Sequence, residues 1–303
     1  MKKYPYKIFS EFIIYCFFLT FIFIMRRVGI KNASNFCGCL CSLIGPLIKT
    51  NKTVRNNLKH VYQDISEEKI NTLQKEIWKN FGRYIGEFAF IDEKFIENNM
   101  SSIEIEIHEN TQKIIDQKTP VIMFGAHIAN WDIALFGVLK YFDNLAVIYR
   151  KINNRFIDQY VRGKRAIKDT RLICKGSYGV KDLVRSIKDH KNFVMLVDQK
   201  MNDGIEVPFL GQKAMTSKAI SLLSVQYGYP IIPVQVIRRS NSSNFKLIFH
   251  DILILETTQD KEAQLYATTL KINNIIGEWV NSNPSQWFWM HQRWGKPHEM
   301  LKK

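Results

Sequence analysis

A histidine and an aspartate five residues apart, His127 and Asp132, are the side chains best placed by type and spacing to do chemistry. They follow the apolar run Pro120–Phe124 and Gly125, in the order strand, glycine turn, histidine, helix. Five residues on a regular helix turn through roughly 500°, so the pair can meet only if His127 lies in the loop and Asp132 in the first helical turn. Asp132 could then fix one imidazole nitrogen and leave the other as a base. The alternative is a helix-start carboxylate that complements the helix dipole beside an ordinary turn histidine.

Alternating strands and helices must position this pair. Short apolar runs predict buried strands, and helical stretches lie between or after them, which indicates a mixed, partly parallel central sheet flanked by helices. Ligands of such sheets bind beyond the carboxyl ends of the strands, and His127 is at such an end. The predicted strands are Pro120–Phe124, Leu145–Tyr149, Phe193–Val197, Ile231–Ile237 and Phe245–Leu255, and the predicted helices are Ile128–Lys140, Tyr178–His190, Thr216–Tyr227 and Glu262–Asn281.

An earlier amphipathic helix is predicted from Asp64. The sequence Asp64-Ile-Ser-Glu67 has the form of a capping box, and apolar residues then recur at helical spacing from Ile70 to Phe88. This pattern indicates a helix with one face toward the core.

The N-terminus is predicted to associate with a membrane. The apolar run Phe12–Met25 has 14 residues, fewer than the roughly 20 of a bilayer span, and Glu11 interrupts its backward extension. A second apolar stretch, Phe36 to Ile48, follows. A short tilted span and an interfacial helix both fit, and a buried helix is the alternative. We therefore expect a membrane-associated helical segment over residues 1–50 and a catalytic domain over residues 51–303.

The charge balance suits an anionic partner. Lys and Arg number 43 against 28 Asp and Glu, a net charge of +15. Nucleic acid, an anionic membrane or a phosphorylated substrate would fit, as would a merely solubilising charge. Because no nucleic-acid-binding motif is present, no nucleic-acid partner is predicted. The sequence also lacks a P-loop and the ligand spacing of a metal site, so no metal is predicted.

The motif around His127 resembles the signature of the glycerolipid acyltransferase superfamily, and the chain is more closely similar to the lipid A biosynthesis lauroyl/myristoyl acyltransferases of Gram-negative bacteria. The resemblance spans almost the whole chain. It includes Val54-Arg55-Asn56-Asn57-Leu58, Trp78-Lys-Asn-Phe-Gly82-Arg83 with Glu87, Gly125-Ala-His127-Ile-Ala-Asn130-Trp131-Asp132, Tyr149-Arg150 with Asn153-Asn154, Asp198-Gln199, Val207-Pro-Phe-Leu-Gly211, Tyr229-Pro-Ile-Ile-Pro233 and Asn283-Pro-Ser-Gln-Trp287-Phe-Trp-Met-His291-Gln-Arg293-Trp294.

The resemblance implies acyl transfer from an acyl carrier protein thioester to a hydroxyl of a lipid A precursor of the Kdo2-lipid IVA type. It implies His127 as general base, oriented by Asp132. The thioester is already activated, so no cofactor or metal is expected. The implied location is the bacterial inner membrane, with the catalytic domain on the cytoplasmic face.

Four further residues are candidates for substrate binding. Arg150 and Arg165 could pair with phosphate or carboxylate groups, although single arginines are often solvated surface cations. Asn130 or nearby backbone N–H groups could donate to the oxyanion. Asp198 follows a predicted buried strand, where a loop cap is the alternative. The family often has Glu at the position of Asp132, and the glycine that usually follows Arg165 is missing here.

Two other functions fit the same sequence. The first is acyl transfer to another glycolipid or to a glycerophospholipid, although the Glu-Gly-Thr-Arg motif usual in the phosphatidate-forming branch is missing. The second is a non-catalytic membrane-surface binding protein, which the positive charge and aromatic content would suit.

Overall fold

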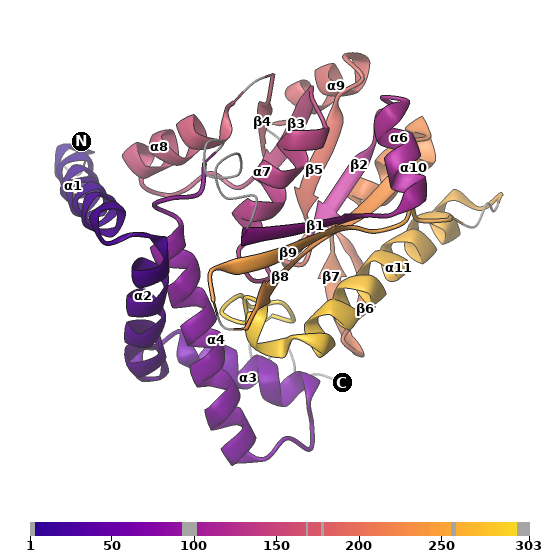
Figure 1. The fold of residues 1–303 in the computed structure, drawn as a ribbon. Helices are drawn as coiled ribbons and strands as arrows, with labels where there is room; N and C mark the ends of the chain where they lie inside the picture. The colour runs from indigo at the N-terminus through magenta and orange to yellow at the C-terminus, as the bar shows by residue number, and fades with distance from the viewer. Residues whose placement is uncertain are drawn as a thin grey trace.

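A mostly parallel sheet forms the centre of the chain (Figure 1). The computed structural model describes residues 4–92, 102–167, 169–176, 179–240, 242–255 and 259–295. Within these ranges seven strands pair in the order β1-β9-β8-β2-β5-β3-β4, and each pair is parallel except β8–β9. The predicted mixed sheet is confirmed. The strands are β1 (Ile103–Ile107), β2 (Ile122–Gly125), β3 (Leu145–Tyr149), β4 (Arg171–Cys174), β5 (Asn192–Leu196), β8 (Ile231–Arg239) and β9 (Asn244–Phe249).

Helices cover both faces of this sheet. The connection from β2 to β3 runs in one direction across the sheet, and those from β4 to β5 and from β5 to β8 run in the other. Because such crossovers are right-handed, α7 lies on one face and α9 and α10 lie on the opposite face. Ser221 and Thr269 share a hydrogen bond of 2.7 Å, which joins α10 to α11. These helices are α7 (Trp131–Tyr141), α9 (Val180–Lys188), α10 (Ala219–Tyr227) and α11 (Lys261–Ser282), with α6 (Glu109–Asp116) and α8 (Arg155–Arg165) between strands.

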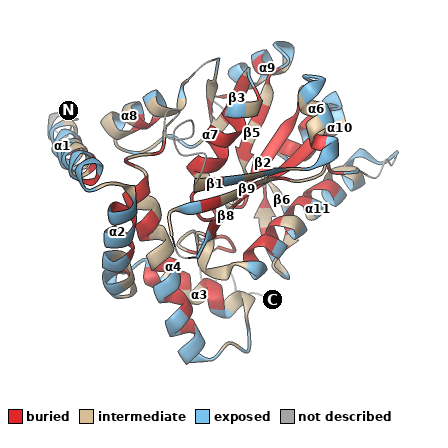
Figure 2. Ribbon diagram, viewed as in Figure 1, coloured by how far each residue is buried: buried red, intermediate tan, exposed pale blue. Residues whose placement is uncertain are grey.

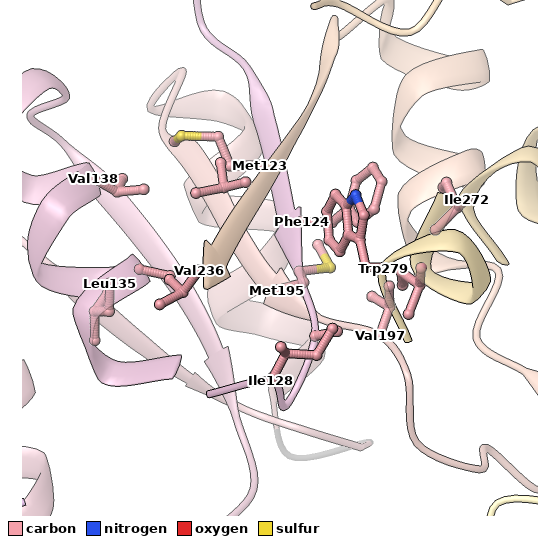
Figure 3. Packing of buried hydrophobic residues seen from close by; sticks show 14 of the residues in the cluster. Met123, Phe124, Ile128, Leu135, Val138, Met195, Val197, Val236, Ile272 and Trp279 are labelled. Atoms are coloured by element: carbon pink, nitrogen blue, oxygen red, sulfur yellow. The ribbon is translucent and has the colours of Figure 1, made fainter. Parts of the chain in front are cut away.

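Strand alternation divides the core into two layers (Figure 3). Met123 lies with Leu135 and Val138 of α7, whereas its neighbour Phe124 faces α11. The ring of Phe124 stacks on that of Trp279, with centroids 6.0 Å apart. Each strand of the middle of the sheet therefore contributes to both layers, and its continuous apolar sequence follows from that.

The N-terminal helices lie to one side of the sheet (Figure 1). α4 packs closely on α2 because glycines replace side chains at their contact. A Cβ at Gly82 would come within 2.2 Å of the Cys37 carbonyl oxygen, and one at Gly86 within 2.4 Å of the Ala33 carbonyl oxygen. These helices are α1 (Tyr4–Val28), α2 (Ile30–Ile44), α3 (Asn51–Val61) and α4 (Glu67–Glu87), and η1 (Gly45–Leu47) follows α2.

The first two helices differ from the next two in what they pack against. Val54 of α3 and Ile77 of α4 belong to the main core, whereas Ile22, Met25 and Ala33 belong to a separate small cluster. Within the described part of the chain one helix, over Tyr6–Val28, is long and apolar enough to cross a membrane, with a mean hydropathy of 2.3. Much of its surface is exposed (Figure 2). The expected division at residue 50 stays a prediction.

Several helices and strands begin or end at other residues than the sequence predicts. The helix predicted from Asp64 begins at Glu67, because Ser66 is extended and its hydroxyl accepts a hydrogen bond from the Lys69 N–H. The capping box at Asp64 is therefore wrong. The helix predicted from Ile128 begins at Trp131, and the strand predicted to Leu255 ends with β9 at Phe249. Tyr178, the predicted start of another helix, lies outside the described residues.

A short antiparallel hairpin was not anticipated. It joins β6 (Ile205–Phe209) to β7 (Gln212–Thr216), and after α11 the chain continues through η4 (Pro284–Gln286). Asn273 of α11 donates to the carbonyl oxygen of Pro208 at 2.9 Å and so ties the hairpin to that helix.

Candidate active site

The loop between β2 and α7 carries His127 and is held by the C-terminal segment. The Ala129 N–H donates to the Gln286 carbonyl at 2.8 Å, and the Phe288 N–H donates to the His127 carbonyl at 2.9 Å. Ile128 forms a bridge with Trp287. Ala129 has a φ of 52°, a left-handed conformation unusual for alanine, which these bonds stabilise. The histidine therefore lies on a fixed loop.

The imidazole of His127 is paired with Asp198. Nδ1 of His127 lies 2.8 Å from Oδ1 of Asp198, and the His127 backbone N–H donates to Oδ2 at 3.0 Å. Gly125 and Leu196 are partners in the β2–β5 ladder, so the two side chains stand opposite one another two residues beyond each strand. The Trp287 indole N–H also donates to Oδ2, at 2.7 Å.

These bonds keep Asp198 ionised. Burial by itself would raise the pKa of Asp198, but the charge and hydrogen bonds of His127 and the bond from Trp287 lower it to about 2. A buried carboxylate favours the tautomer in which Nδ1 carries the proton. Nε2 is then left with its lone pair, 3.4 Å from the side-chain nitrogen of Gln199.

Asp132 does not orient His127, and that prediction is wrong. Its Oδ1 accepts two hydrogen bonds from Arg165 of α8, at 2.6 and 3.0 Å, and its Oδ2 accepts one from the Tyr84 hydroxyl at 3.1 Å. The first turn of α7 thus directs the carboxylate to α8 and α4. Burial opposes ionisation of Arg165, but the charge of Asp132 raises its pKa. Burial and the charge of Asp132 both raise the pKa of Tyr84.

An apolar cavity of about 460 Å³ adjoins this cluster. His127, Asp132, Arg150 and Arg165 are among its lining residues, so four of the six predicted site residues meet there. The His127 side chain is 18% exposed, whereas that of Asp198 is 1% exposed. The imidazole therefore lies between Asp198 and the cavity. Aliphatic side chains make up most of the remaining wall, among them Met123, Leu135, Val138, Val147, Val194, Leu183 and Leu223.

Asn130 has a structural contact. Its amide donates to Oε2 of Glu87 at 2.8 Å, and both side chains are fully buried. Glu87 also pairs with Arg238 of β8 and accepts a hydrogen bond from Ser34 of α2 at 2.7 Å. This buried network ties α2, α4 and β8 to the start of α7. A substrate contact by Asn130 stays a prediction.

Cationic groups stand around the cavity. Arg150, at the end of β3, is exposed, and Lys175 follows β4. Burial lowers the pKa of Lys175, against the opposing charges of Asp198 and Asp203. Lys175 was not predicted as a site residue, because the residues beside it and those of β4 do not distinguish it from a surface lysine. Among the residues with described positions, no group of His, Cys, Asp or Glu side chains is arranged to hold a metal ion.

Five chains among the solved structures match this chain, and one of them is an acyltransferase. The crystal structure of the 1-acyl-sn-glycerophosphate acyltransferase PlsC from Thermotoga maritima aligns with a TM-score of 0.39 and 12% identity, over 92% of this chain and 99% of that one. No curated protein sequence matches the chain significantly.

The family is established by a match along nearly the whole chain. The model of the family described as bacterial lipid A biosynthesis acyltransferase matches residues 2–296. The matched region contains the His127 loop, the strands that position it and the C-terminal segment that holds it. The chain therefore belongs to the bacterial lipid A biosynthesis acyltransferase family and is an O-acyltransferase.

Proposed function

We propose that this enzyme transfers a fatty acyl group from an acyl carrier protein thioester to a hydroxyl of a lipid A precursor of the Kdo2-lipid IVA type, with His127 as general base. The observation that carries the proposal is the bond of 2.8 Å between Nδ1 of His127 and the buried Asp198, beside an apolar cavity. A base held in one tautomer at the wall of an apolar cavity suits an acyl donor and a hydroxyl acceptor.

The reaction follows from this geometry. Nε2 of His127 takes the proton of the acceptor hydroxyl as its oxygen attacks the thioester carbonyl carbon. A carbon–oxygen bond forms, the tetrahedral intermediate collapses, and the carbon–sulfur bond breaks. The imidazolium then returns its proton to the departing thiolate. Asp198 stabilises the imidazolium by charge and by its hydrogen bond, and is a positioning residue in this scheme.

The cations around the cavity would bind the phosphates of the acceptor. Arg150 is exposed and lines the cavity, so it is available to an anionic ligand. Arg165 also lines it, but Asp132 already accepts two of its hydrogen bonds. We therefore assign phosphate binding first to Arg150, and to Arg165 a role that depends on its pairing with Asp132.

The proposed location is the inner membrane, with the catalytic domain on the cytoplasmic face. The apolar helix over Tyr6–Val28 and the basic surface support membrane association. The acyl carrier protein is proposed as the acyl donor on the cytoplasmic side.

Replacement of the base tests the proposal. His127→Gln should lower turnover from acyl carrier protein to a tetra-acylated lipid A precursor by about 10²–10⁴-fold, as loss of a general base does. Product mass would be followed by mass spectrometry with the purified full chain. His190→Asn is the matched control, because His190 is exposed at the end of α9 and asparagine tolerates its φ of 48°.

Two results would contradict the proposal. Unchanged turnover in a folded His127→Gln enzyme would show that His127 is not the general base. Faster acylation of a lysophospholipid than of the lipid A precursor by the unmodified enzyme would show that the lipid A precursor is not the preferred acceptor.

A further inference from the structure

The cavity beside His127 contacts both faces of the sheet. Successive strand residues point to opposite faces. Nevertheless Val147, Ile148 and Tyr149, which are consecutive in β3, all line the cavity, and so do the β5 residues 194–196. The cavity therefore extends around the carboxyl ends of these strands, with an arm on each face.

The arm on the α7 side is enclosed. Met123 lies with Leu135 and Val138 on this face (Figure 3), and the ladders place Val194 and Val147 on the same face as Met123. Met123, Leu135, Val138 and Val147 are all buried. We call this part of the cavity, lined by these five residues, the closed arm.

The arm on the other face opens between α9 and α10. Met195 is the ladder partner of Phe124 and shares its face, and Ile148 points the same way because it alternates with Val147. Leu183 of α9 and Leu223 of α10 line this part of the cavity. We call it the open arm.

Apolar side chains continue from the open arm to the surface. Val180 and Leu222 both line the cavity, yet they are 53% and 41% exposed. A hydrocarbon chain could thus enter between α9 and α10 along apolar surface. The closed arm has no comparable exposed apolar side chain among the five residues that define it.

We propose that the open arm binds an acyl chain of the acceptor lipid while the closed arm holds the acyl group that is transferred. This inference rests on the proposed function. The acceptor is a lipid with its own hydrocarbon chains, so a site with an apolar entrance lets one chain enter without crossing water. The two arms meet at His127, where the hydroxyl of one ligand and the thioester of the other must come together.

Filling one arm at a time tests the inference. Ala219 lines the cavity at the start of α10 and is half-buried, so Ala219→Phe should place a ring in the open arm. The KM for a tetra-acylated lipid A precursor should rise about tenfold, the effect of about two methylene groups no longer leaving water. The KM for acyl carrier protein and the preferred donor chain length should stay unchanged.

Val138→Phe in the closed arm should instead shorten the preferred donor chain.

Matched variants keep the test decisive. Leu222→Trp repeats the block from an exposed position that does not contribute to the core, in case Ala219→Phe fails to fold. Val184→Trp is the control, because Val184 is 46% exposed on α9 and does not line the cavity. The inference is overturned if blocking the open arm changes donor chain preference or leaves the acceptor KM unchanged. If the unmodified enzyme does not acylate the precursor from acyl carrier protein, the proposed function itself fails.

Discussion

At the scale of the residue, the orientation of the His127 imidazole is set by a carboxylate that follows a neighbouring strand, and not by one in the helix that follows its own loop. Asp198 lies two residues beyond β5, and His127 lies two residues beyond β2. Parallel pairing of these strands brings the two side chains to 2.8 Å. The spacing to Asp132 is local and visible in the sequence, whereas this pairing is not. Asp198 was predicted as a substrate-binding residue, but its contact with the imidazole depends on a strand order that sequence patterns do not reveal.

A second histidine, His291, gives a prediction about stability and pH. Its Nε2 accepts a hydrogen bond from the Lys200 N–H at 2.8 Å. Burial lowers its pKa to about 4, Asp198 opposes the shift, and His127, Arg293 and Lys175 add to it. The unfolded chain therefore binds this proton more readily between about pH 4 and 6.5, and stability falls as pH drops through that window.

The measurement compares the unmodified chain with His291→Gln, whose side-chain oxygen can still accept from Lys200. The free energy of unfolding, measured by urea titration, should lose up to about 1.4 kcal/mol per pH unit below pH 6.5 in the unmodified chain. His291→Gln should flatten this dependence. Equal pH slopes in the two proteins would contradict the assignment.

At the scale of the element, the glycines of α4 allow α2 to pack closely on α4, and Glu87 and Tyr84 of α4 in turn contact the start of α7. A Cβ at Gly86 would meet the backbone of Ala33, which cannot move aside as a side chain can. Gly86→Ala should therefore cost about 1–3 kcal/mol of stability, measured by urea unfolding. Gly163→Ala is the control, because nothing lies within 4 Å of its added Cβ on α8. It should be neutral or stabilise by up to about 1 kcal/mol. A Gly86→Ala chain as stable as the unmodified one would contradict the close packing.

The sequence predicted the central strands well, gave β9 an end six residues too late, and missed the two edge strands. β3 has the predicted bounds, and β5 and β8 lie within two residues of theirs, because strands covered on both faces are continuously apolar. β1 alternates Ile and Glu because it is an edge strand with one exposed face, and β4 begins with Arg171 at the opposite edge. A search for apolar runs therefore missed both of them.

At the scale of the whole molecule, a chain with an excess of positive charge carries an exposed apolar helix, α1. Phe9 and Phe17 of α1 are 64% and 73% exposed. Such a helix would bind a bilayer through its aromatic side chains, and the net charge of +15 would strengthen binding to anionic lipids. The composition of the sequence predicts that this segment associates with a membrane. It does not distinguish a helix that spans the bilayer from one that lies along it, because that depends on how the helix meets the lipid.

Vesicle binding tests this account of α1. Phe17→Asp should weaken sedimentation with vesicles of anionic phospholipid at least about tenfold, because a buried Phe contributes about 1.5–3 kcal/mol and a carboxylate is repelled. Tyr266→Asp on α11 is the control, since this side chain is 41% exposed but far along the chain from the apolar helix. Equal loss in the two variants, or none in Phe17→Asp, would show that α1 does not carry membrane binding.

The pairing of His127 with Asp198 is tested most directly by kcat for acyl transfer in Asp198→Asn, measured beside Asp132→Asn with saturating donor and acceptor. An asparagine keeps the size of the side chain but no longer holds the imidazole in the required tautomer or stabilises the imidazolium. We predict that Asp198→Asn lowers kcat by on the order of 10²–10⁴-fold, and that its loss exceeds that of Asp132→Asn. Turnover of a folded Asp198→Asn enzyme close to that of the unmodified protein, or a larger loss in Asp132→Asn, would contradict this pairing.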